Sequence, residues 1–204
     1  MSFLYHLYTG RDYGRGMNKN KGLVRPAATF ALLTLVPGAL AQTQVAPETH
    51  PVGDIPDSQA FVRYVSAPGG YSLEIPEGWA RREQGGTVSF TSKYGTVELT
   101  ARQAARTPGV AAVRAGDLAA LARTDPSVKV TLVKAAPLPA GNAVLARFTS
   151  TSAPNAVTGR RAVLDNDLYV LTRNGREVVL RMSAPRGADN VDAWNRVARS
   201  FVWR

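Results

Sequence analysis

Polar and apolar residues alternate along much of the chain after residue 60, which is the pattern of half-buried β-strands. In "GYSLEIPEGW" (70–79), Tyr71, Leu73 and Ile75 alternate with polar neighbours, and a Pro-x-Gly turn follows. Asn174-Gly175, between β-rich runs within 167–183, is the strongest hairpin signal. Further strands are predicted at 61–66, 88–90, 97–99, 128–135, 143–151 and 159–164.

Two segments repeat apolar residues at helical spacing instead. Thr107-Pro108 predicts the start of the first helix, and Asp189 or Asn190 is expected to cap the second. Their apolar stripes are Val110, Val113, Leu118 and Leu121 in the first, and Val191, Trp194, Val197 and Phe201 in the second. The order of elements predicts an α+β fold, an antiparallel sheet with helices packed on it.

The first 41 residues have the pattern of a targeting segment. Residues 17–41 combine a positive start, an apolar core and a small-residue end, which predicts a secretory signal peptide cleaved between Ala41 and Gln42. The apolar run is shorter than the ~20 residues of a membrane span. Residues 1–16 precede the charged start and are predicted to be a mis-called extension, with translation beginning at Met17. We therefore expect an exported protein, periplasmic or extracellular, that is soluble after cleavage and has no transmembrane anchor.

Composition divides the remaining chain. Residues 42–59 are Pro-rich and lack apolar periodicity, so they are predicted to be a linker, and residues 60–204 a single domain. The chain has no cysteine, and its two histidines, His6 and His50, lie outside that domain. Ser-His-Asp and Cys-His nucleophile systems and zinc sites built on His or Cys are therefore excluded within it. No glycine-rich phosphate loop is present, and we expect no cofactor and no metal.

Carboxylates and tryptophans are the remaining candidates for chemistry. Asp165 and Asp167 would share a face of a straight strand and form a calcium cluster or an acid/base couple. "DND" also has the composition of a turn, which is the favoured interpretation. Trp79 and Trp194 are expected in the core, and Trp203 stays open as a residue that stacks on a ligand.

The chain is basic, with a formal net charge of +10. Residues 1–41 hold five of its 25 basic and one of its 15 acidic residues, so +6 remains after cleavage. Arg173 and Arg176 flank the Asn174-Gly175 turn. Together with Arg160 and Arg161 on the preceding strand they form a candidate anion-binding patch; the alternative is an ordinary solvated surface.

The start at 70–79 and the end, "YVLTRNGREVVLRMSAP" followed by "DAWNRVARSFVW", resemble the Mog1/PsbP-like proteins. The resemblance covers nearly all of 61–204 and implies an α/β/α sandwich. It also implies a non-catalytic role, because members of that family include photosystem-associated extrinsic subunits, a binder of a small GTPase and exported bacterial proteins. Its motifs are fold motifs, so no site residue carries over.

These observations favour an exported, non-enzymatic binding or accessory domain of a bacterial envelope, with a protein or envelope-polymer partner. Two alternatives remain open. The first is a binder of anionic envelope polymers or nucleic acid through an Arg-rich surface. The second is a hydrolase that uses carboxylates only.

Overall fold

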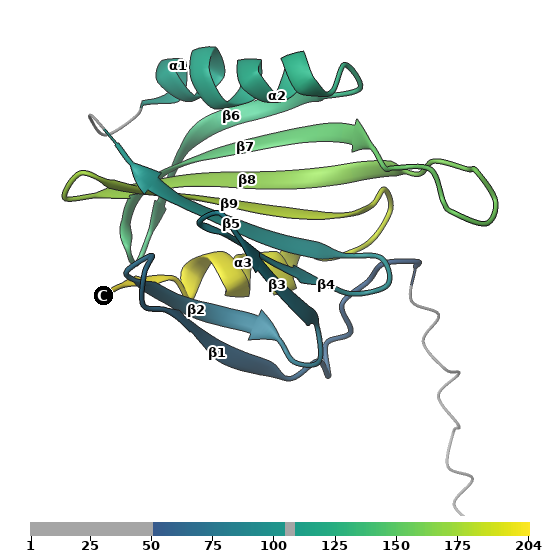
Figure 1. Ribbon diagram of the computed structural model, residues 1–204, viewed down its shortest axis with the longest axis horizontal. Helices are drawn as coiled ribbons and strands as arrows, with labels where there is room; N and C mark the ends of the chain where they lie inside the picture. Colours follow the sequence, from purple (N-terminus) through teal and green to yellow (C-terminus); the bar gives the residue numbers. More distant parts are fainter. Residues whose placement is uncertain (1–50, 105–108) are drawn as a thin grey trace, which may run out of the picture. The chain divides into compact units, whose positions relative to one another are not determined.

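A computed structural model of the chain describes residues 51–104 and 109–204. Seven antiparallel strands form its main sheet, in the order β3-β4-β5-β9-β8-β7-β6 (Figure 1). The strands are β3 (Ala80–Gln84), β4 (Thr87–Thr91), β5 (Thr96–Gln103), β6 (Lys129–Leu138), β7 (Gly141–Thr151), β8 (Val163–Arg173) and β9 (Arg176–Pro185).

The β8–β9 hairpin is the turn that the sequence predicts. Arg173 pairs with Arg176 across a two-residue loop. Asn174 and Gly175 in that loop have φ values of 51° and 73°. Positive φ at both central positions defines the type I′ turn, whose twist matches that of the strands it joins.

One face of this sheet packs against a second, smaller layer. That layer contains helix α3 (Val191–Arg199) and a three-stranded sheet in the order β1-β2-β10. Its strands are β1 (Phe61–Ser66), β2 (Tyr71–Pro76) and β10 (Val202–Trp203). The larger core cluster lies between these layers and draws side chains from both sheets and from α3.

The other face carries a helical segment made of α1 (Val110–Val113), η1 (Arg114–Leu118) and α2 (Ala119–Thr124) (Figure 1). Val113 and Leu118 are both buried in the second core cluster. They are five residues apart, a spacing that would turn Leu118 well away from Val113 in a regular α-helix. The π-helical turn η1 widens the helix between them, so both point at the sheet. The start expected at Thr107-Pro108 lies outside the described residues.

The structure corrects three features of the predicted C-terminal half. The strand predicted at 159–164 and the turn predicted at "DND" are both replaced by β8, one strand from Val163 to Arg173. The last helix ends at Arg199, so Phe201 lies beyond it, and β10 follows. Val191, expected on the buried stripe, is 56% exposed.

Part of the predicted linker also packs on the domain. Ile55 is buried, and its backbone N–H donates to Asn190 Oδ1 at 2.7 Å. Asn190 Nδ2 donates in turn to the Gly53 carbonyl at 2.9 Å. Asn190 is the residue before α3, yet its side chain makes no capping hydrogen bond to the helix. Its side chain instead binds the backbone of residues 53–55, so the packed structure begins before residue 60.

Candidate functional site

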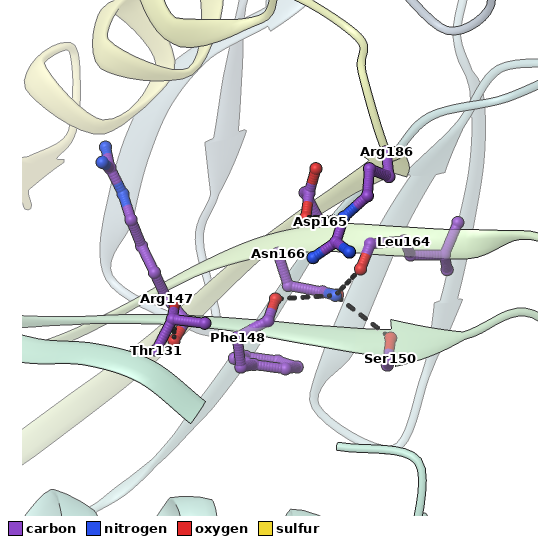
Figure 2. A network of polar contacts seen from close by, with 8 residues as sticks. All are labelled: Thr131, Arg147, Phe148, Ser150, Leu164, Asp165, Asn166 and Arg186. Atoms are coloured by element: carbon purple, nitrogen blue, oxygen red, sulfur yellow. Dashed lines mark hydrogen bonds and ion pairs between the residues drawn. The ribbon is translucent and has the colours of Figure 1, made fainter. Parts of the chain in front are cut away.

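Strand β8 presents charged side chains to one face of the sheet and an amide to the other. Asp165 and Asp167 face the layer of α3, and Asn166 between them faces the opposite side. Figure 2 shows Asp165 with Arg147 and Arg186 on the side of α3, and Phe148 and Ser150 on the other side. The turn interpretation is wrong because β7 and β9 pair with this stretch on both edges. Two complete ladders of backbone hydrogen bonds outweigh the local preference of Asp and Asn for turns.

Each carboxylate has an arginine partner. Arg147 lies directly opposite Asp167 in the register, and its Nε is 3.1 Å from Oδ1 and 3.3 Å from Oδ2. Arg186 follows β9, and its Nε is 3.3 Å from Asp165 Oδ1. The two ion pairs therefore lie side by side, with both carboxylates on β8 and the two arginines on either side of it.

These pairs line a pocket of about 270 Å³, which we call the α3 pocket. Its walls come from β6 to β9 and from the start of α3. Besides the four charged residues, its principal lining residues are Thr131, Thr149, Pro185, Asn190, Val191 and Trp194.

The two carboxylates differ in burial and therefore in their electrostatic environment. The side chain of Asp167 is 9% exposed and that of Asp165 is 45% exposed. Burial raises the pKa of Asp167 above its usual value, while the charge of Arg147 acts in the opposite direction. Asp167 is thus the more deeply placed and more costly charge of the pocket.

All three tryptophans pack in or against the larger core cluster, as the sequence predicts for Trp79 and Trp194. Trp203, which we left open for ligand stacking, is 9% exposed and packs edge-on against Phe201 at 5.1 Å between ring centroids. Trp79 is partly buried and packs over the β4–β5 loop, where a Cβ at Gly95 would lie 2.8 Å from its ring. Trp194 is partly buried, packs against the larger core cluster and also lines the α3 pocket. It is therefore Trp194 that can contact a ligand.

The α3 pocket offers binding groups and no activated nucleophile. Among the described residues there is no histidine or cysteine, and no group of three acidic residues that could hold a metal ion. Each carboxylate is already engaged by a guanidinium.

The four arginines of the predicted patch are divided between the two ends of β8. Arg160 and Arg161 lie in the β7–β8 loop, not on a strand, and Arg173 and Arg176 lie at the β8–β9 hairpin (Figure 1). Since β8 has 11 residues, about 30 Å of strand separates the two pairs. The hairpin pair instead borders a hollow of about 260 Å³ with Asn174, Trp203 and Arg204.

Arg147 and Arg186 are the site residues that sequence reasoning missed. Arg147 interrupts an apolar strand, and Asp167 interrupts the next one. Two inward charges of opposite sign on consecutive strands signal an ion pair, but only once the register between the strands is known. Arg186 follows a strand end, and no local pattern distinguishes it.

No protein-family model matches the chain, and no curated protein matches it significantly. Solved structures do match. PsbP of the cyanobacterium Synechocystis sp. PCC 6803 aligns with 74% of this chain and 98% of its own, at 14% identity and a TM-score of 0.56. The Saccharomyces cerevisiae Ran-binding protein Mog1p aligns with 71% of this chain and 95% of its own, at 12% identity and 0.45.

A Bacteroides thetaiotaomicron structure aligns with 70% of this chain at 16% identity and a TM-score of 0.45. Only 48% of that protein is covered, so this chain spans about half its length. Identities this low show the fold alone. The chain has the Mog1/PsbP-like α+β fold that its sequence predicted.

No helix in the described part of the chain is both long and apolar enough to cross a membrane.

Proposed function

We propose that this chain is an exported, non-catalytic binding domain and that the α3 pocket holds its ligand. The proposal rests chiefly on one observation: two Arg–Asp pairs and a partly buried tryptophan line the same pocket. The signal-peptide pattern of residues 17–41 supports export, and the absence of histidine and cysteine after residue 50 supports a non-catalytic role.

The balance of charge in the pocket favours an uncharged, hydroxyl-rich ligand such as an envelope saccharide. A net anion or cation would compete with one member of each ion pair. A sugar hydroxyl both donates and accepts, so it can bind a guanidinium N–H and a carboxylate oxygen that are already held together. The indole of Trp194 adds a flat apolar wall, against which the C–H face of a sugar ring can pack.

The test is calorimetric titration of the exported protein with a panel of neutral disaccharides, including N-acetylglucosamine disaccharide, maltose and trehalose. At least one should bind. Arg186→Gln should weaken that binding about tenfold or more, as loss of a charge-assisted hydrogen bond does, and Trp194→Phe should weaken it because the ring face is smaller. Arg199→Gln, an exposed arginine of α3 outside the pocket, is the matched control. Failure of the whole panel to bind, or binding unchanged in both pocket variants, would contradict the proposal.

A second candidate function, the binding of polyanions, is favoured by the hollow at the hairpin end. There Arg204 joins the predicted pair Arg173 and Arg176. Three guanidinium groups around one hollow provide the charge density that a phosphate-rich polymer needs.

The divided patch supplies its own control for this function. Changing Arg173 and Arg176 together to Gln should reduce binding of polyphosphate and of single-stranded DNA at low salt, whereas changing Arg160 and Arg161 should not. Equal losses in the two double variants would indicate a general effect of net charge, and no binding by the wild type would remove this function altogether.

A further inference from the structure

A second pocket lies on the opposite face of the main sheet, under α2, and we call it the α2 groove. Its volume is about 270 Å³. Leu168 and Val179 form an apolar floor, and Leu121 of α2 forms one wall. Charged residues stand at its two ends: Arg102 and Asp117 at one, Glu98 and Arg181 at the other.

The first charged end combines one positive and two negative groups. Arg102 donates from Nε to Glu177 Oε1 at 2.6 Å and also contacts Asp117 through Nη2. Burial lowers the pKa of Arg102, but the hydrogen bonds with these two carboxylates outweigh burial and leave it raised. One guanidinium thus serves two acids, and this end has no uncompensated positive charge for a ligand.

Arg181, at the second end, is held in place by neutral groups and forms no direct ion pair. Its Nε and Nη2 donate to Asn166 Oδ1 at 3.2 and 3.0 Å, and its guanidinium lies 5.4 Å from the centre of the Phe148 ring. In residues 51–104 and 109–204, no carboxylate lies within ion-pair distance of it. Neutral partners fix its position, and the carboxylate of Asp125 acts on it electrostatically without forming an ion pair. A guanidinium that is held in place without a direct ion pair is a preorganised recognition group.

The amide that holds Arg181 is itself fixed. Asn166 Nδ2 donates to Ser150 Oγ at 3.1 Å and to the carbonyls of Phe148 and Leu164, both at 3.3 Å (Figure 2). Its orientation is therefore determined by the strands, with Oδ1 directed at Arg181. Because Asn166 is 2% exposed, water does not compete for these hydrogen bonds.

Glu98 is the complementary feature. It lies directly opposite Arg181 in the β5–β9 register, where opposite charges normally pair. The two side chains nevertheless form no ion pair, because Arg181 is turned toward β8. A second carboxylate near this end, Asp125, accepts from the Ser127 N–H at 2.9 Å and hydroxyl at 2.6 Å. These hydrogen bonds are the main cause of its lowered pKa, and the charge of Arg181 acts in the same direction.

We propose that the α2 groove binds a small apolar zwitterion, an α-amino acid or short peptide with a hydrophobic side chain. Its carboxylate would pair with Arg181, its ammonium with Glu98, and its side chain would cover Leu168, Val179 and Leu121. A simple anion would neutralise Arg181 but would also face Glu98, and a simple cation would meet the reverse conflict. Only a ligand with both charges satisfies the two groups, and the volume of the groove suits one amino acid of medium size.

The test compares four probes by calorimetry on the exported protein: leucine, leucinamide, N-acetylleucine and 4-methylpentanoate. Leucine should bind, and each probe that lacks one charge should bind about tenfold more weakly or worse, the effect of losing one charge-assisted hydrogen bond. Arg181→Gln and Glu98→Gln should each reduce leucine binding to a similar extent.

Arg186→Gln, on the other face of the sheet, is the matched control and should leave leucine binding unchanged. Thermal unfolding of each variant shows whether it is folded. Glu98→Gln should unfold close to the wild type, whereas Arg181→Gln leaves the buried Asn166 Oδ1 without its donors and should unfold at a somewhat lower temperature. Equal binding of leucine and 4-methylpentanoate, or no binding of leucine, overturns the proposal. Because the α3 pocket is on the opposite face, its saccharide test stands or fails independently.

Discussion

Two pockets of about 270 Å³ lie on opposite faces of the same strands, and they differ in how their charges are balanced. In the α3 pocket both carboxylates are paired with arginines that the sheet brings to them. In the α2 groove Glu98 and Arg181 lie opposite each other and remain apart. The difference comes from one residue: Asn166 holds Arg181 from the neighbouring strand.

The alternating side chains of β8 give the two faces of the sheet different chemistry. Asp165 and Asp167 close one face with ion pairs, whereas Asn166 leaves a charge open on the other. A paired site presents donors and acceptors without net charge, and an unpaired site selects for charge. The same stretch of three residues therefore contributes to two kinds of recognition.

The largest expected effect is a loss of stability, and its size should distinguish a tryptophan of the core from one that lines a pocket. Trp203→Ala should lower the free energy of unfolding by about 3–5 kcal/mol, because a buried aromatic ring leaves a cavity. Trp194→Ala should cost less, about 1–2 kcal/mol, because its ring is only partly buried at the edge of the core cluster. Urea denaturation of both variants measures the difference; a Trp194 loss as large as that of Trp203 would show that Trp194 belongs to the core.

Asn166→Ala should have the next largest effect, a loss of about 1–3 kcal/mol, because it leaves buried polar groups of β7 and β8 without their partner. It should also release Arg181 and weaken leucine binding while preserving saccharide binding. The matched variant is Asn195→Ala, an exposed position on α3, which should change neither. Loss of both ligands from the folded variant would contradict the independence of the two faces.

The pH dependence of Asp167 follows from its raised pKa. A carboxyl with a higher pKa in the folded than in the unfolded protein favours folding when protonated. Its contribution is thus present below the unfolded value of about 3.9 and is lost as the pH rises through the folded pKa. Asp167→Asn, which resembles the protonated acid, should gain stability relative to the wild type between pH 3.5 and 7. A relative loss over that range would mean that the Arg147 ion pair outweighs burial.

The smallest effect should be that of Arg186→Gln on stability. Arg186 and Asp165 are both well exposed, so their ion pair should contribute no more than about 0.5 kcal/mol. Saccharide binding should nevertheless fall clearly, because binding depends on where the guanidinium is held. A variant whose binding is unchanged would exclude Arg186 from the site.

Much of the architecture could be predicted from local patterns. Alternation located most strands, Asn174-Gly175 fixed the last hairpin, and the terminal motifs indicated the fold. The two-residue β10 could not be found in this way, because it forms only where the chain after α3 meets Tyr71 and Ser72 of β2.

The site was harder to predict because it depends on pairing between distant strands. "DND" has turn composition, and only its neighbours β7 and β9 make it a strand. Arg147 and Asp167 are 20 residues apart in sequence, and their contact depends on the register. Predicting that Trp203 is more deeply buried than Trp194 also required knowing where α3 ends. Trp203 is buried because it belongs to β10 and does not extend the helix.

Two variants, one on each face of the sheet, test whether the α3 pocket and the α2 groove are separate binding sites. Arg186→Gln and Arg181→Gln are each titrated calorimetrically with leucine and with the disaccharide that the wild type binds. Each variant should lose a different ligand. Arg186→Gln should lose the disaccharide and keep leucine, and Arg181→Gln should lose leucine and keep the disaccharide. Loss of the same ligand in both variants, with both proteins folded, would contradict the account of two separate sites.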